Sequence, residues 1–127
     1  MNTDAHSSKR FWVSMLPRLK GAFGETKAAK YLRKNKYEII ASGYYSRFGE
    51  IDLIAKKGNT IVFIEVKTRK DASFAKAFEF VDRNKIQKIK ATAQIWMSQN
   101  DKDYDYRFDV IEIYTENDTL NHIENAF

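Results

Sequence analysis

The stretch that decides the fold is IVFIEVKTR (residues 61–69). Its leading apolar residues are typical of a strand that is buried on both faces. Because side chains alternate along a strand, Phe63, Glu65 and Lys67 share one face, while the face that includes Val66 belongs to the core. Taking an ion out of water costs several kcal/mol, so an acid and a base here indicate a functional site. The alternative is a surface ion pair at the strand end, worth about 0–1 kcal/mol.

The preceding pattern, GEIDLIAKK, predicts a second strand that is joined to the first by a tight turn at KGN. A two-residue loop of Lys57 and Gly58 would pair Asp52 with Phe63. Asp52 would then lie diagonal to Glu65 on one face, about 7–8 Å away between backbones. A register changed by one residue would move Asp52 to the opposite face. Because Lys is a poor choice where a turn needs positive φ, a longer loop with a bulge is the alternative.

Two carboxylates this close repel each other, and the pKa of one rises strongly unless a cation lies between them. Mg²⁺ suits such a pair, because it prefers oxygen ligands and binds one or two carboxylates together with water and phosphate. We expect Mg²⁺ as the cofactor, with Mn²⁺ able to substitute. Lys67 can orient or help deprotonate a metal-bound water and offset charge on a phosphate. These are the parts that metal-assisted hydrolysis of a phosphodiester requires.

The rest of the chain predicts an α/β protein in which helices cover a central sheet. Residues 1–20 are expected to form a flexible or loosely packed arm in which Pro17 breaks or starts a short helical turn, and residues 21–127 a single domain. The expected elements are a helix over 24–36, a short strand from residue 37 to near Gly43, two strands within 49–69 that are joined at residues 57–59, and strands over 106–114 and 120–127. An irregular connection is expected over 71–81, and a helix over 83–99 with Asp82 as its N-cap.

Composition excludes several classes of site. The chain has no cysteine, which rules out disulfides, thiolate metal sites and cysteine nucleophiles and fits a reducing cytoplasm. The lone His122 of the last strand is expected to be structural. No apolar run approaches the roughly 18 residues that cross a bilayer. We therefore expect a soluble cytoplasmic protein without a membrane partner.

Charge is unevenly distributed. The net charge is +5, yet residues 101–127 hold 2 basic and 8 acidic residues, so the remaining chain is strongly basic. A basic body favours a polyanion partner, DNA or another nucleic acid, although a solvated lysine-rich surface is the alternative. Arg69 and Lys70 directly follow the acid–base pair and could bind a nucleic-acid backbone. Lys85 could contact phosphate or lie on a solvated face.

Aromatic residues precede the predicted site. Arg47 lies in the stretch YYSRF, whose rings could stack on an unpaired base. Packing of the rings beneath the loop is the alternative.

Together these motifs resemble a known family. Asp52 followed by Glu65-x-Lys67 is similar to the signature of the PD-(D/E)xK nuclease superfamily, with Ile51 where that name has proline. More closely, GET…YL, GEIDLIA, FIEVKTR, a lysine-rich helix and RFDVI resemble the YraN-type family of bacterial proteins. That family is similar to archaeal Holliday junction resolvases. The resemblance covers residues 21–127.

The resemblance implies a restriction-endonuclease-like fold with a central mixed sheet of four to five strands flanked by helices. It implies that Asp52 and Glu65 bind the metal, that the Val66 carbonyl is a third ligand, and that Lys67 is catalytic. Glu25 matches an acidic residue on the first helix of the resolvases, which helps to position metal or water. Taken alone, Glu25 is also a favourable residue near a helix start.

Three hypotheses follow for the function. The first is a Mg²⁺-dependent endonuclease that hydrolyses DNA, at branched structures such as Holliday junctions, and that pairs as a homodimer. The second is a nucleic-acid-binding module of the same fold that does not cut. The third is an accessory domain whose basic face binds another protein.

Overall fold

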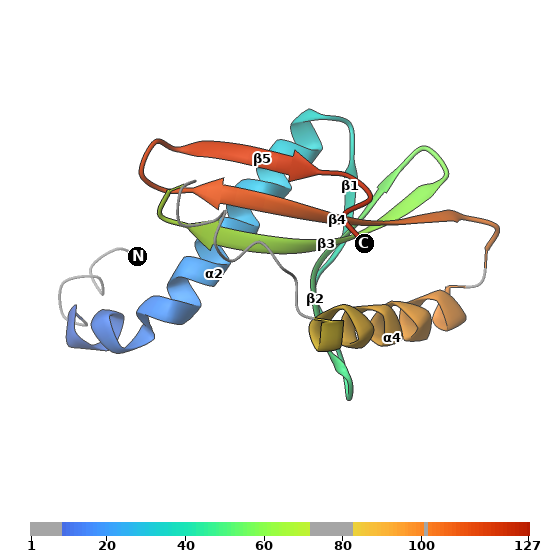
Figure 1. The fold of residues 1–127 in the computed structure, drawn as a ribbon, viewed down its shortest axis with the longest axis horizontal. Helices are drawn as coiled ribbons and strands as arrows, with labels where there is room; N and C mark the ends of the chain where they lie inside the picture. The colour runs from blue at the N-terminus through green and yellow to red at the C-terminus, as the bar shows by residue number, and fades with distance from the viewer. Residues whose placement is uncertain (1–8, 72–82, 101) are drawn as a thin grey trace.

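A five-stranded sheet flanked by two helices forms the protein (Figure 1). The computed structural model describes residues 9–71, 83–100 and 102–127, with side chains from residue 22 onward. The elements in chain order are α2 (Lys9–Lys34), β1 (Glu38–Ser46), β2 (Gly49–Lys57), β3 (Thr60–Arg69), α4 (Arg83–Gln99), β4 (Asp105–Tyr114) and β5 (Thr119–Ile123).

The sheet is mixed, as the family resemblance implies. Its strands lie in the order β1-β2-β3-β4-β5. Neighbours pair antiparallel except β3 and β4, which are parallel. Parallel strands need a long crossover, and α4 lies within that connection. The α/β architecture is consistent with a restriction-endonuclease-like fold.

Each helix covers one face of the sheet, because each carries an apolar stripe at helical spacing. From α2, Ala28 and Leu32 pack against Val62, Ile64 and Ile111. The members of the α4-side core are Ile51, Ile54, Ile61, Phe63, Ile89, Ala93 and Trp96. Strand β3 therefore supplies both cores, which explains its continuous apolar run.

The first helix is longer than the sequence predicts. It begins at Lys9, whereas the predicted start at residue 24 is wrong. Pro17 and Gly21 weaken helices, which favoured the later start, yet the backbone remains helical through both. The helix crosses the expected boundary after residue 20. Residues 1–8 lie outside the described residues, so the division into arm and domain stays a prediction.

Gly24 is required where α2 approaches β3. A Cβ atom built on Gly24 would collide with the Thr68 hydroxyl. The absence of a side chain therefore lets the helix lie directly on the C-terminal half of β3.

The end of α2 is capped by its own backbone. Tyr37 N donates to Leu32 O (2.9 Å) and Lys36 N donates to Arg33 O (3.1 Å). Lys36 adopts a left-handed conformation with φ of 71°. This is a Schellman motif, a position where glycine is favoured.

The hairpin between β2 and β3 has a different register from the one predicted. Its loop is Gly58-Asn59, since Lys57 pairs with Thr60, and the pairing of Asp52 with Phe63 is wrong by two residues. Gly58 has φ of 61° and takes the first central position of the turn, which type II′ hairpins give to glycine. Because the shift is even, Asp52 still lies on the side of Glu65.

The two hairpin strands separate before they end. Their pairing stops at Leu53 with Ile64. Beyond this fork β2 pairs with β1 and β3 pairs with β4. The β1–β2 hairpin twists away beneath α4 (Figure 1), so that Ile51 and Ile54, at positions of opposite parity, both reach the α4-side core.

The first strand, β1, continues to Ser46, so its predicted end near Gly43 is wrong. Helix α4 occupies residues 83–99 as predicted. The last strand ends at Ile123, whereas the sequence extends it to residue 127. Asp82 and the irregular connection lie almost wholly outside the described residues. Within the described part of the chain, no helix is long and apolar enough to span a membrane.

Candidate functional site

A cavity of about 600 Å³ opens at the fork, between β2, β3 and the first turns of α4. Its lining residues are Gly49, Glu50, Asp52, Glu65, Val66, Asn84, Lys85, Lys88 and Ile89. Four residues predicted for the site are therefore brought together here: Asp52, Glu65, Val66 and Lys85. They come from three elements that meet only in the folded chain.

Asp52 fills the gap that the fork leaves in the sheet. Val66 N donates a hydrogen bond of 2.8 Å to Asp52 Oδ2, which replaces the missing bond from a neighbouring strand. Burial and the negative charge of Glu65 raise the pKa of Asp52 to about 7, against the hydrogen bond from Val66, which lowers it. Two carboxylates therefore face one another in a site that water only partly reaches.

Glu65 is the more deeply buried acid, with 5% of its surface exposed. Two ammonium groups approach its Oε2 atom, Lys85 Nζ at 2.5 Å and Lys67 Nζ at 3.6 Å. Burial lowers the pKa of Lys85, but its hydrogen bond with Glu65 and the charge of Glu65 outweigh burial and raise it. Lys85 thus neutralises Glu65 from the α4 side and Lys67 from the strand.

The donor set suits a hard divalent cation. Asp52 and Glu65 supply carboxylate oxygens. A strand residue directs its N–H and C=O toward the same neighbour, so the Val66 carbonyl faces the side on which Asp52 lies. Among the described residues no group of three or more acidic, histidine or cysteine side chains could hold a metal. Such an ion would therefore take its other ligands from water or from a substrate phosphate.

Glu25 lies beside this cavity and not in it. It lines a neighbouring hollow on the α2 side with Thr26, Arg33 and Ser42. Burial first, and then the charge of Glu50, raise the pKa of Glu25, while a hydrogen bond with Ser42 opposes them. Glu25 therefore senses the charge of the acidic cluster without lining its cavity.

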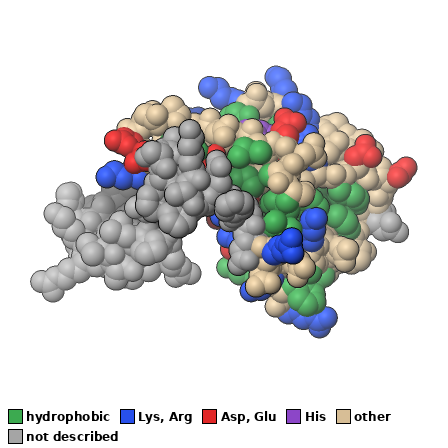
Figure 2. Space-filling view, viewed as in Figure 1, with side chains coloured by type: hydrophobic (Ala, Val, Ile, Leu, Met, Phe, Trp, Pro, Cys, Tyr) green, Lys and Arg blue, Asp and Glu red, His purple; other side chains and the backbone are tan. Residues whose placement is uncertain are grey.

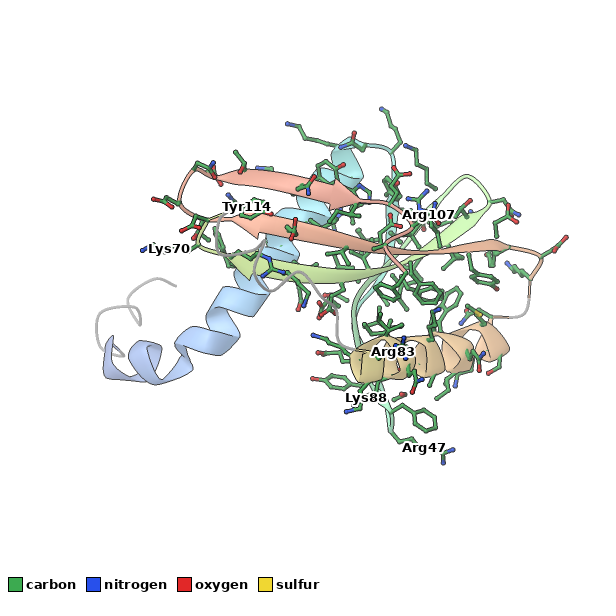
Figure 3. All side chains as sticks on the ribbon, viewed as in Figure 1. Arg47, Lys70, Arg83, Lys88, Arg107 and Tyr114 are labelled. Carbon is green, nitrogen blue, oxygen red and sulfur yellow. The ribbon has the colours of Figure 1, made fainter. Side chains whose placement is uncertain are left out.

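The predicted nucleic-acid contacts are divided between two ends of the molecule (Figure 3). Arg47 is exposed at the turn between β1 and β2, toward the side on which Lys88 lies. Lys70 is exposed at the far end of β3, near Tyr114. Arg69 donates to Glu112 Oε2 (3.2 Å) and is largely buried. Arg69 is thus engaged within the protein, unlike the exposed Lys70.

Sequence reasoning missed two residues of the cavity, Asn84 and Lys88. A signal for Lys88 was available, because it lies three residues after Lys85 and so shares its helix face. Glu50, a second acid on β2, also lines the cavity and is partly buried.

Two other buried acids, Asp109 and Glu112, have lowered pKa values, whereas the pKa of Asp52 is raised. Asp109 is fully buried and accepts two hydrogen bonds from Arg107 (2.9 and 2.8 Å), together with one from His122 (2.7 Å). Burial opposes its ionisation, but these bonds outweigh burial and hold the pKa of Asp109 below its ordinary value. Glu112, bonded to Tyr114, behaves likewise. Both acids are satisfied internally, and His122 is part of that structural network.

A family model matches residues 24–113, from the Gly24 contact to the end of the apolar part of β4. Its description is "Uncharacterised protein family UPF0102". The chain belongs to the UPF0102 family. This confirms the YraN-type resemblance, and the matched segment of the UPF0102 chain contains every residue that lines the cavity.

Relatives of this UPF0102 chain align along nearly their whole length. A UPF0102 protein of Caldanaerobacter subterraneus is 47% identical over 113 residues, covering 84% of this chain and 93% of its own. A UPF0102 protein of Vibrio campbellii is 45% identical over 105 residues, covering 80% and 86%. One from Persephonella marina is 42% identical over 110 residues, covering 86% and 93%.

Proposed function

We propose that this UPF0102 protein is a divalent-metal-dependent phosphodiesterase that hydrolyses nucleic acid, related in its chemistry to the PD-(D/E)xK nucleases. The observation that supports the proposal most is the carboxylate pair of the fork. Asp109 and Glu112 have partners that lower their pKa values, whereas burial and Glu65 raise that of Asp52 to about 7. Perturbed acids in a cavity are typical of functional sites.

Mg²⁺ is the proposed cofactor, held by Asp52, Glu65 and the Val66 carbonyl. When bound, it would polarise a phosphoryl oxygen and lower the pKa of a coordinated water. Lys67 then has its own part. It lies two residues beyond Glu65 on the same face, with its ammonium 3.6 Å from the carboxylate and partly exposed. In that position it neutralises charge that develops on a phosphate and orients the attacking water.

The proposed substrate is DNA, with branched forms such as Holliday junctions as the finer hypothesis. Cations on the α4 side of the cavity support a polyanion: Lys85 and Lys88 line it opposite the acids of β2 and β3, and Arg47 lies at the neighbouring turn. In Figure 2, Lys and Arg side chains occur at the lower edge of the face shown, where Figure 3 labels Arg47 and Lys88. Homodimer formation stays a prediction.

One observation favours the second hypothesis, a module that binds nucleic acid without cutting it. The Lys85 ammonium lies 2.5 Å from Glu65 and provides the positive charge that a metal would otherwise supply. If that ion pair persists in the presence of Mg²⁺, the cavity binds phosphate through its lysines alone.

Cleavage and binding assays decide between these functions. Purified protein is incubated with labelled duplex, single-stranded and four-way-junction DNA in Mg²⁺, in Mn²⁺ and in EDTA. We expect metal-dependent cutting that falls roughly 10²–10³-fold in Lys67→Met. Glu65→Gln should be similarly inactive. Lys102→Met is the control for loss of one positive charge, because Lys102 is an exposed residue of the connection between α4 and β4.

The possible outcomes separate cleanly. Cutting by the wild type and by Lys102→Met, together with loss in both site variants, supports the phosphodiesterase. Equal binding by all variants with no cutting in either metal refutes it and leaves the binding module. Cutting that persists in Lys67→Met and Glu65→Gln would mean that the cavity is not the active site.

A further inference from the structure

A second hollow adjoins the cavity at the fork. It has a volume of about 330 Å³ and is lined by Phe48, Asn84, Gln87, Lys88 and Ala91. Asn84 and Lys88 line both hollows, so the two are neighbours along the first turns of α4. Neither the carboxylate pair nor Lys67 requires this second space.

The hollow exists because the turn between β1 and β2 lies against α4. Ser46 pairs with Gly49, which makes Arg47 and Phe48 a two-residue loop. The backbone at Gly49 approaches Lys88 so closely that an added Cβ would lie 3.5 Å from the Lys88 Cβ. The Ser46 hydroxyl bonds to that of Thr92 (2.8 Å) and holds the turn to the helix.

Phe48 is one of the large apolar side chains that are exposed among the described residues. It leaves 40% of its surface open to water, whereas Trp96, the aromatic residue of α4, is buried. Its backbone N–H is bonded to Ser46 Oγ (3.0 Å), which fixes the residue at the turn. The Arg47 guanidinium lies 4.8 Å from the ring centroid. The turn therefore presents an exposed aromatic ring with a positive charge over it.

The chemistry of the hollow matches an unpaired nucleotide. An aromatic ring offers a stacking surface that accepts any base, because every base has a π-face. The side-chain amide of Gln87 carries both donors and an acceptor, the groups that bind base edges. Lys88 provides a cation between the hollow and the carboxylate pair, where the phosphate of that nucleotide would lie.

We propose that this hollow is a binding site for one unpaired nucleobase, stacked on Phe48, next to the phosphodiester that enters the metal cavity. The proposal rests on the proposed function and narrows its substrate class to single-stranded or locally unpaired nucleic acid. A base within an intact duplex cannot enter, because it is stacked on both sides. DNA and RNA share this chemistry, and the experiment distinguishes them.

Binding is measured without cleavage, so that the test does not depend on catalysis. Single-stranded DNA and RNA oligonucleotides that contain 2-aminopurine, and a blunt DNA duplex, are titrated in EDTA at low salt. We expect stacking on Phe48 to quench the probe fluorescence. Phe48→Ala should weaken single-strand binding roughly 5- to 150-fold and abolish the quench, while duplex affinity changes less than about twofold. Phe48→Trp should retain both signals.

Tyr45→Ala is the matched control. Tyr45 lies on the same hairpin and is more exposed than Phe48, at 75%, but does not line the hollow. An equal loss in Tyr45→Ala, or an equal loss for duplex and single strand in Phe48→Ala, would overturn the proposal. A folded Phe48→Ala protein with unchanged single-strand affinity would do the same. If DNA and RNA lose affinity alike, the site recognises the base; if only one does, it also recognises the sugar.

Failure here is separable from failure of the proposed function. A protein that cuts no substrate but shows the Phe48-dependent preference keeps the base site and loses the phosphodiesterase. A protein that cuts with the same preference after Phe48→Ala keeps the phosphodiesterase and loses the base site.

Discussion

Replacing Asp52 by Asn should stabilise the metal-free protein, with an effect that grows as the pH rises. Burial and the charge of Glu65 raise the pKa of Asp52 from 3.8 to about 7 on folding. Well below pH 3.8 the carboxyl is neutral in both states, so its ionisation costs nothing. As the pH rises toward 7 the unfolded chain loses this proton while the folded protein keeps it, and folding stability falls. Asn resembles the neutral form at every pH.

The magnitude follows from the size of the shift. One pKa unit corresponds to about 1.36 kcal/mol, so the full shift costs the wild type about 4 kcal/mol above pH 7. Between pH 5 and pH 7, the advantage of Asp52→Asn should therefore grow by about 2 kcal/mol, since half of the folded carboxyl has already ionised at pH 7. The amide oxygen still accepts the bond from Val66 N, so the fork stays intact. Asp52→Ala leaves that N–H without a partner and should lack most of the gain.

Urea unfolding followed by circular dichroism, in EDTA at pH 5, 6, 7 and 8, measures this difference. Asp105→Asn is the control, because Asp105 is an exposed carboxylate at the start of β4. A constant difference between Asp52→Asn and the wild type across this range would refute the reasoning. The two carboxylates would then not be held together in the folded protein.

Three further predictions concern other parts of the molecule. Lys85→Met should increase the affinity for Mg²⁺ in calorimetry by up to about fivefold, because it removes the ammonium group that contacts Glu65. Lys88→Met is the control, since Lys88 lines the same cavity and has no such contact, and it should leave the affinity unchanged. Equal effects of the two substitutions would show that the total charge of the cavity is responsible. Lys36→Gly should raise the free energy of unfolding by about 0.5–1 kcal/mol because it relieves the left-handed backbone, and a loss of stability would contradict the helix end described. Asp109→Ala should destabilise the protein by about 3–5 kcal/mol, because Arg107 is left without its buried partner; a change under 1 kcal/mol on urea unfolding would show that this network is not closed.

Much of the sheet could be predicted because its signals are local. The alternation of Phe63, Glu65 and Lys67 needs only the geometry of one strand, and the KGN turn links it to the next. The register is less local. It depends on which residues occupy the turn, and the structure places Gly58-Asn59 there. The start of α2 could not be predicted, since helix propensity disfavours a helix that continues through Pro17.

The candidate site likewise has a part that local sequence signals predict and a part that depends on contacts between distant residues. The acids on the hairpin were identifiable because one turn brings their strands together. The hollow beside Phe48 was not, because it depends on where α4 lies relative to the β1–β2 turn. That placement is set by contacts between residues far apart in sequence, such as Ser46 with Thr92.

The fork also has a mechanical consequence. Within the described strands, ladder bonds between β2 and β3 end at Leu53, and a side chain continues the connection. Beyond this point the sheet is therefore divided into two parts, which remain joined by the paired residues of β2 and β3. Asp52 lies on one part and Glu65 on the other. A change in the angle between the two parts would change the distance between the Asp52 and Glu65 oxygens. Under the proposed function, bending at the fork would let the site adjust to the radius of the bound ion without repacking of the two cores.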